Sequence, residues 1–173
     1  NFTTATDTYN TAVGFNAGLS VTTGIRNTLI GGLAGDALTD ADYNVALGMQ
    51  ALTSDTLGSR STAIGFSALE AQNFTTATDS YNVAVGYQTG KTITTGRQNA
   101  LVGSQAGDAL TVGSSNAVLG QNALGADTAG NNSVAIGDSA LRTQNFTTAT
   151  DAYNTAVGHA AGYAITTGIQ NTL

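Results

Sequence analysis

The chain has 173 residues, with 22 Gly, no Pro, Cys or Trp, and a formal net charge of −6 from 11 acidic and 5 basic residues. The lack of cysteine excludes disulfides and thiolate metal sites, and the scattered basic residues form none of the patches that nucleic-acid binding requires, so no nucleic-acid partner is expected. No apolar run is long enough to cross a bilayer as a helix, so no membrane insertion is expected, and the many Val, Ile and Thr residues argue against disorder.

The first predicted element is an enlarged turn at residues 1–7, Asn-Phe-Thr-Thr-Ala-Thr-Asp. The same stretch begins again at residues 73 and 145, so residues 1–173 form one array of 72-residue repeats, of which the third is incomplete. In a stack of coils, an insertion is expected as a loop on one face. We expect Phe74 and Tyr81 to attach this turn to the stack. Asn-Phe-Thr is also an N-glycosylation tripeptide.

The next predicted element is a short strand at residues 11–14, Thr-Ala-Val-Gly. A small residue, an aliphatic residue and Gly recur along the chain, with the glycines at Gly14, Gly31, Gly48, Gly65, Gly86, Gly103, Gly120, Gly137 and Gly158. Their spacings are 17, 17, 17 and 21 residues in each 72-residue repeat, so the opening stretch marks every fourth, enlarged coil. These periods predict an all-β parallel β-solenoid of 17-residue coils, with a 21-residue coil every fourth.

Each motif Gly is flanked by residues of constant type. Asn or Ser stands four residues before it, and Asn tolerates left-handed backbone and can form hydrogen-bonded ladders between coils. Ala or Thr stands three residues after it, where only a small side chain is expected to fit. A Thr pair and Gly follow in three of the coils, as at residues 22–24, and indicate a turn. We therefore expect a second strand near the Thr-rich segment of each coil.

The two residues before each motif Gly are both apolar. We expect the aliphatic residue next to Gly to point inward, as in Val13 and Ile30, and the residue before it to point outward, because side chains alternate along a strand. That outward position is also apolar, with large side chains at Leu29, Leu101 and Val118. A strand that is apolar on both faces is expected to be buried on both faces. The pattern therefore predicts a cyclic homo-oligomer.

These motifs resemble known repeats. The segments NSVAIG (Asn132 to Gly137), NAVLG and STAIG resemble the head repeats of trimeric autotransporter adhesins of the YadA-like type, and YNTAVGFNAGLSVTTGIRN resembles repeats of phage tail fibres and surface proteins. The resemblance covers the whole chain and implies a left-handed parallel β-roll packed as a homotrimer. The coils here are longer than those of the adhesin heads. Neither end shows an atypical capping coil, so we expect a segment of a longer fibre.

Catalytic, cofactor and metal sites are not expected. His159 shares its repeat position with Phe15, Met49 and Tyr87, which indicates a variable surface position. The recurring acids lack the convergent acid, base or nucleophile groups of an active site, and no calcium-binding nonapeptide repeat occurs. An isolated Asp in a turn favours a turn role over a metal ligand. A column of Thr residues raises ice binding as an alternative, but its adjacent Thr pairs do not share a face.

The expected function is structural and non-enzymatic: the shaft of a trimeric extracellular fibre, either a phage tail fibre on a virion or a bacterial surface adhesin, that serves attachment to a host or surface. One alternative is a self-assembling extracellular filament. Another is a module that binds a cell-surface receptor or glycan through its enlarged coils. Fold alone does not choose among these functions.

Overall fold

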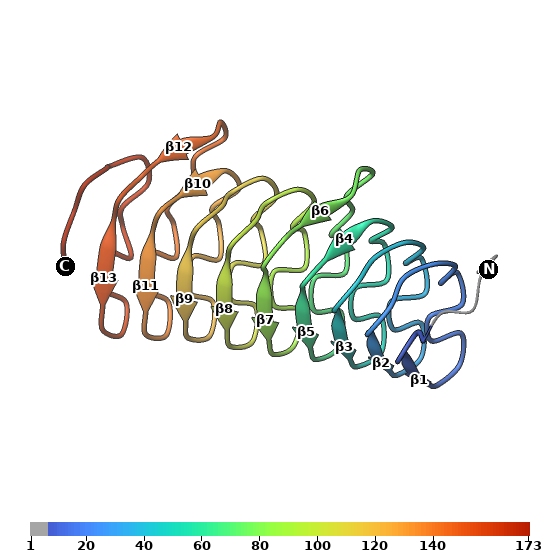
Figure 1. The fold of residues 1–173 in the computed structure, drawn as a ribbon. Helices are drawn as coiled ribbons and strands as arrows, with labels where there is room; N and C mark the ends of the chain where they lie inside the picture. The colour runs from blue at the N-terminus through green and yellow to red at the C-terminus, as the bar shows by residue number, and fades with distance from the viewer. Residues whose placement is uncertain (1–6) are drawn as a thin grey trace.

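Each coil contributes one three-residue strand to a parallel sheet, and the strands follow one another in chain order along a rod (Figure 1). The computed structural model describes residues 7–173. The nine strands of this sheet are β1 (Thr11–Val13), β2 (Thr28–Ile30), β3 (Val45–Leu47), β5 (Thr62–Ile64), β7 (Val83–Val85), β8 (Ala100–Val102), β9 (Ala117–Leu119), β11 (Val134–Ile136) and β13 (Thr155–Val157). The parallel β-solenoid predicted from the sequence is confirmed, and the described residues contain no helix.

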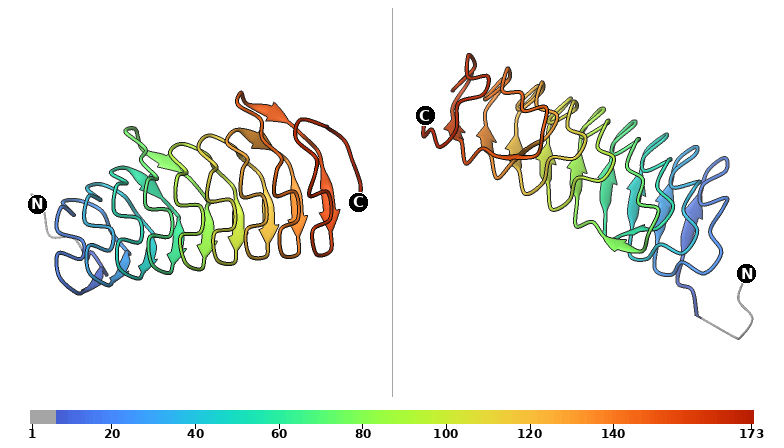
Figure 2. Two further views of the ribbon diagram at one scale, coloured as in Figure 1. Left: turned by 180° about the vertical axis from the view of Figure 1, so that it is seen from behind. Right: turned by 90° about the horizontal axis from the view of Figure 1, so that it is seen from above.

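The register between strands follows the sequence repeat. Ala46 lies beside Ala63 and Ala84 beside Leu101, so each motif residue meets its counterpart one coil away. The two ends of the chain lie at opposite ends of the rod in both further views (Figure 2). Most of the first enlarged turn, residues 1–6 with Phe2, lies outside the described residues.

Within residues 7–173, second strands occur only in the enlarged coils and in the coil before each of them. Strand β4 (Gly58–Ser59) pairs with β6 (Thr78–Asp79), and β10 (Gly130–Asn131) pairs with β12 (Thr150–Asp151). The prediction of a second strand in every coil was therefore wrong. At Thr22 and Gly24 both backbone N–H groups donate to one carbonyl, that of Thr39, at 3.0 and 3.1 Å. Because successive N–H groups converge on one acceptor, this segment bends instead of forming an extended strand.

The two faces of the main sheet are the reverse of the sequence prediction. The residue two before each motif Gly points inward: Leu29 and Leu101 are 1% and 0% exposed. The aliphatic residue next to Gly points outward, with Val13 at 58% and Leu119 at 51% exposure. A 17-residue coil encloses a narrow core, which the small residues at the inward position and the buried Ala column, such as Ala34, fill. The larger Val, Ile and Leu of the outward column remain outside.

In several coils a large residue on the strand is paired with a small one in the turn, or the reverse. Leu29 on β2 faces Gly35 in the next turn, where a Cβ would lie 2.8 Å from the Leu29 Cδ2. In the following coil the strand carries Ala46, and Leu52 occupies the position of Gly35, fully buried at a φ of 55°. Gly35 has nearly the same φ, 54°. A side chain absent from the strand is thus replaced by one from the turn.

Candidate functional site

A buried polar cluster holds each enlarged coil to the coil before it. The Asp55 Oδ1 accepts hydrogen bonds from the backbone N–H groups of Gly58 and Phe74, both at 3.0 Å, and its Oδ2 accepts one from Gln72 Nε2 at 2.6 Å. Burial raises the pKa of the Asp55 carboxyl, and the hydrogen bonds from Gln72 and Phe74 oppose that rise. The carboxylate is a fixed acceptor for the chain that enters the enlarged turn.

The remaining members of the cluster are also paired. Gln72 Nε2 donates to Ser61 Oγ at 2.8 Å, Gln72 Oε1 accepts from Asn82 Nδ2 at 2.8 Å, and the hydroxyls of Ser61 and Ser80 share a hydrogen bond. The enlarged coil that begins at residue 145 repeats these contacts at Asp127, Ser133, Gln144, Phe146 and Asn154, except the one between two hydroxyls, because Ala152 stands in place of Ser80. Because its polar groups are used within the chain, the cluster is structural.

Sequence reasoning did not identify Gln72 and Gln144 as part of this cluster. The signal was present: Gln recurs with a period of 72 residues, in the two coils where the Asn column changes to Ser61 and Ser133. Phe74 was correctly predicted to attach the enlarged turn, since it is 6% exposed. Tyr81 was not, because its ring is 52% exposed and its hydroxyl donates to Asp79 at 3.2 Å.

The Asn column forms the predicted hydrogen-bonded ladder. The Nδ2 of Asn99 donates to the Gly113 carbonyl at 2.9 Å, and its Oδ1 accepts from the backbone N–H of Asn116 at 3.1 Å. The left-handed residue is not the Asn but the one before it, as in Gln98 with φ 58°. The backbone N–H of Asn99 also donates to Asn82 Oδ1 at 3.0 Å, so Asn99 connects three successive coils and fixes their register.

Arg and Tyr alternate on the surface beside this ladder. The Arg26 guanidinium lies 5.9 Å from the Tyr9 ring centroid and 5.3 Å from that of Tyr43, and Arg60 lies 4.8 Å from Tyr43. Arg60 also forms an ion pair with Asp79 at 2.9 Å. These cation–π contacts link coils along one edge, each worth about 0.5–1 kcal/mol at exposed sites.

The outward face of the sheet is a long apolar surface. We call it the outer sheet face; it consists of the outward strand residues Thr11, Val13, Thr28, Ile30, Val45, Leu47, Thr62, Ile64, Val83, Val85, Ala100, Val102, Ala117, Leu119, Val134, Ile136, Thr155 and Val157. Large residues also follow the motif Gly at this edge, where the rings of Phe66 and Tyr87 stack with centroids 5.5 Å apart. The described chain leaves this face largely open, since most of its Val, Ile and Leu side chains, such as Leu47, are exposed and the others are half-buried.

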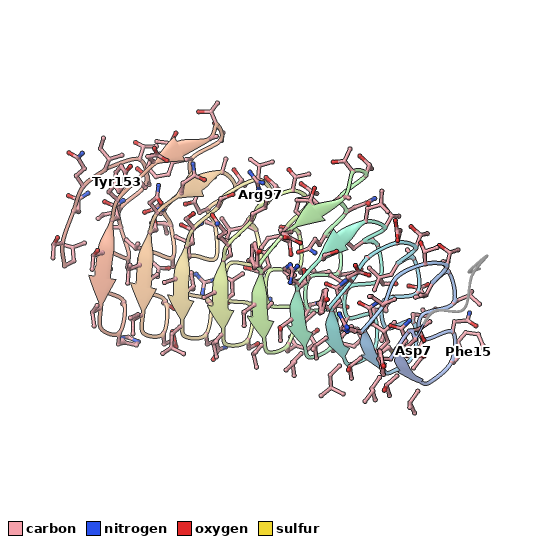
Figure 3. All side chains as sticks on the ribbon, viewed as in Figure 1. Asp7, Phe15, Arg97 and Tyr153 are labelled. Carbon is pink, nitrogen blue, oxygen red and sulfur yellow. The ribbon has the colours of Figure 1, made fainter. Side chains whose placement is uncertain are left out.

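A surface hollow lies beside the enlarged coil at β6. It has a volume of about 440 Å³ and is lined mainly by Asp79, Tyr81, Arg97 and Gln98. Figure 3 shows Arg97 on the same edge of the rod as Tyr153, the edge from which the enlarged coils project. The Arg97 guanidinium makes no hydrogen bond or ion pair with residues 7–173. The counterparts of Arg97 one repeat away are Ile25 and Ile169, so this arginine is particular to the second repeat.

The acids and histidine weighed from the sequence are not brought together. His159 is exposed, Asp40 accepts the Thr23 hydroxyl at 2.6 Å, and Asp42 accepts the backbone N–H of Ile25 at 2.8 Å. Within residues 7–173 no three acidic or His side chains gather in a way that could hold a metal ion.

The Thr column weighed for ice binding uses its hydroxyls within the fold. Thr39 Oγ1 donates to the Thr56 carbonyl at 3.0 Å, and Thr111 Oγ1 donates to the Thr128 carbonyl at 2.9 Å. These hydroxyls therefore link adjacent coils.

The comparisons with known proteins give no relative. No protein-family model matches the chain, and no curated protein or solved structure is significantly similar to it. Over residues 7–173 there is also no helix of the length and apolarity needed to cross a membrane.

Proposed function

We propose that the chain is a segment of the shaft of a homotrimeric extracellular fibre, a phage tail fibre or a bacterial surface adhesin, with a structural and non-enzymatic role in attachment. The observation that carries the proposal is the outer sheet face. Wholly parallel sheets occur almost always with both faces covered. Here the core covers one face, and exposed Val, Ile and Leu side chains line the other.

Packing of three outer sheet faces around a common axis would remove this apolar surface from water. Each square ångström of apolar surface buried contributes roughly 25 cal/mol, and the outward aliphatic column supplies one such residue per coil. The left-handed coil and the threefold axis are the arrangement that the resemblance to adhesin heads implies.

A rod of this kind serves attachment mechanically. Each described coil is joined to the next by backbone hydrogen bonds and by the Asn ladder or, at the enlarged coils, by the buried polar cluster, so the array keeps its length and direction. A shaft of three chains would hold three copies of a distal binding element away from the particle or cell. Three copies raise avidity without any new contact.

The oligomeric state tests the proposal directly. We expect sedimentation equilibrium to give a constant mass of three chains across a concentration range. Val102→Asp, in the outer sheet face, should lower the mass to one chain because it buries a charge in the trimer interface. The matched control is Val112→Asp. Val112 is 42% exposed and Val102 is 38% exposed, but Val112 lies off the sheet. The counterpart of Val112 one repeat earlier is Asp40, so the fold accepts an acid there.

Other outcomes would change the assignment. A wild-type mass that grows with concentration would favour the self-assembling filament. A monomer would contradict the shaft, and an equal effect of Val102→Asp and Val112→Asp would contradict the interface. Circular dichroism of both variants should keep the wild-type β signal, since both side chains point away from the core.

The hollow beside β6 favours a second function, receptor or glycan binding through the enlarged coil. Tyr81 supplies an aromatic face, and Arg97 and Gln98 supply hydrogen-bond donors. Removal of the exposed tip, Thr75–Ala77, should abolish retention on glycan-coated beads while the buried Asp55 cluster keeps the coil folded. Retention that survives the deletion, or wild-type protein that shows none, would reject this function.

A further inference from the structure

A second hollow lies on another edge of the rod, in the turns five residues after each motif Gly. The residues at this position in successive coils are Leu19, Asp36, Thr53, Glu70, Lys91, Asp108, Gly125, Arg142 and Tyr163. Some neighbouring residues in this column are joined by a hydrogen bond or an ion pair. The Thr53 hydroxyl donates to Asp36, and Lys91 lies 3.7 Å from Glu70.

The column is interrupted at Gly125. Its φ lies outside the left-handed region, and every other coil has a side chain at the same place, so the backbone does not require glycine here. A Cβ at Gly125 would lie 3.0 Å from the Asn122 carbonyl oxygen, a tight contact, and 3.5 Å from Asp108 Oδ1. In the preceding repeat the same place is filled by Thr53, which covers Asp36. The missing side chain leaves a hollow of about 350 Å³.

The hollow is lined by polar side chains, and the Asp108 carboxylate accepts a hydrogen bond from its own backbone N–H. Gln105, Asp108, Asn122 and Arg142 surround it, and none of these four side chains forms a hydrogen bond or ion pair with another of residues 7–173. Burial raises the pKa of the Asp108 carboxyl, and the positive charges of Arg142 and Lys91 oppose the rise. The counterpart of Arg142 in the first repeat is Glu70, so the combination of a carboxyl and a guanidinium is specific to this place.

We propose that the hollow at Gly125 binds a neutral sugar unit of a glycan. A sugar hydroxyl both donates and accepts: one can donate to the Asp108 carboxylate while its neighbours accept from Arg142 and from the side-chain amides of Gln105 and Asn122. Asp108 and Arg142 are separated by two coils, about 10 Å along the axis, with Gly125 between them. The opposite charges balance, so a neutral ligand with hydroxyls on several sides matches the lining better than an ion.

The test is a titration of the ¹⁵N-labelled protein, followed by the amide signals of the lining residues. The probes are the methyl glycosides of glucose, galactose, mannose and N-acetylglucosamine, each taken into the millimolar range in which single sugars bind. We expect at least one to shift the Gly125 and Asn122 signals with saturation. Gly125→Thr, which copies the Thr53 arrangement, should weaken that binding at least tenfold and leave the Asp36–Thr53 region unchanged.

Two further measurements keep the test decisive. Gly125→Thr should be folded, because every other coil carries a side chain at this position, and its circular dichroism spectrum should match that of the wild type, so loss of binding cannot be attributed to unfolding. Glycine, a zwitterion, serves as the competing probe for the Asp108–Arg142 pair. Saturable binding of glycine without any sugar, no shift with any of the four glycosides, or binding that persists in Gly125→Thr would each overturn the proposal.

Discussion

At the scale of single residues, the motif glycines are set by two requirements at once. Their φ angles, such as 132° at Gly103, lie where residues with a side chain are strained. A Cβ at Gly103 would also lie 2.6 Å from the carbonyl oxygen of Gly120 in the next coil. Gly158 shares the first requirement, with φ 139°, but its nearest neighbour would be the Ala161 Cβ at 3.9 Å. A comparison of substitutions at Gly103 and Gly158 therefore separates the cost of backbone strain from the cost of contact between coils.

We predict that Gly158→Ala lowers the unfolding free energy by about 1–3 kcal/mol, the usual cost of a strained backbone. Gly103→Ala should lower it by a further 1–3 kcal/mol or so, because the methyl group overlaps the next coil. Urea unfolding of both variants beside the wild type measures the difference. Equal losses would show that the stacked coils separate easily and that only the φ angle demands glycine.

Asp55 makes stability depend on pH in an unusual direction. Because burial raises its pKa above the value of about 3.9 in an unfolded chain, the folded state binds the proton more tightly. Its contribution is therefore fully present below pH 4 or so and is lost as the pH rises through the folded pKa. The unfolding free energy of the wild type minus that of Asp55→Asn should decrease between about pH 4 and neutrality. Urea titrations at several pH values check this; a difference that rises with pH would contradict it.

At the scale of the coil, the repeat length was predictable and the direction of the side chains was not. The spacing of the motif glycines directly predicts the stacked strands and the position of the enlarged turns. Alternation along a strand shows that two columns face opposite ways, but it does not say which faces inward. Leu29 suggested a large outward residue, whereas in the structure Leu29 is buried and Ile30 points outward. The narrow core determines which column faces inward, since it accepts Ala in most coils and Leu only where the turn carries Gly.

The candidate sites could be predicted less well than the fold for a similar reason. Recurrence identifies residues that every coil needs, such as the buried Ala and Asn columns. The hollows depend instead on single departures from the repeat, Arg97 in place of Ile and Gly125 in place of Thr. The effect of a residue that differs in one coil cannot be predicted until the side chains of the neighbouring coils are placed beside it.

We predict a compensating pair within the coil of β3. Leu52→Gly should lower the unfolding free energy by about 2–5 kcal/mol because it empties the core, and Ala46→Leu should lower it by about 1–3 kcal/mol because it overfills the core. The double variant copies the Leu29–Gly35 pair and should lose less than the sum of the two single losses. Equilibrium unfolding of all four proteins gives the coupling energy. Additive losses would show that positions 46 and 52 do not share one space.

At the scale of the whole molecule, each coil contacts only the coils beside it, so stability should vary along the rod. Repeat arrays of this kind behave as sums of unit and interface terms, and their terminal units open first. In the described chain the three residues of β1 are exposed, whereas the middle residue of every other strand of the main sheet is buried.

Amide hydrogen exchange should therefore show a gradient from the centre of the array to its ends. We expect the amides of β7 and β8 to exchange slowest, because they lie in the middle of the array with several coils on both sides of them. Those of β1 should exchange fastest, because all three residues of this strand are exposed. Val102→Asp sharpens the test, since loss of the proposed trimer would speed exchange along the whole outer sheet face, whereas Val112→Asp would leave the gradient unchanged. Uniform protection in the wild type would instead mean that the coils unfold as one cooperative unit.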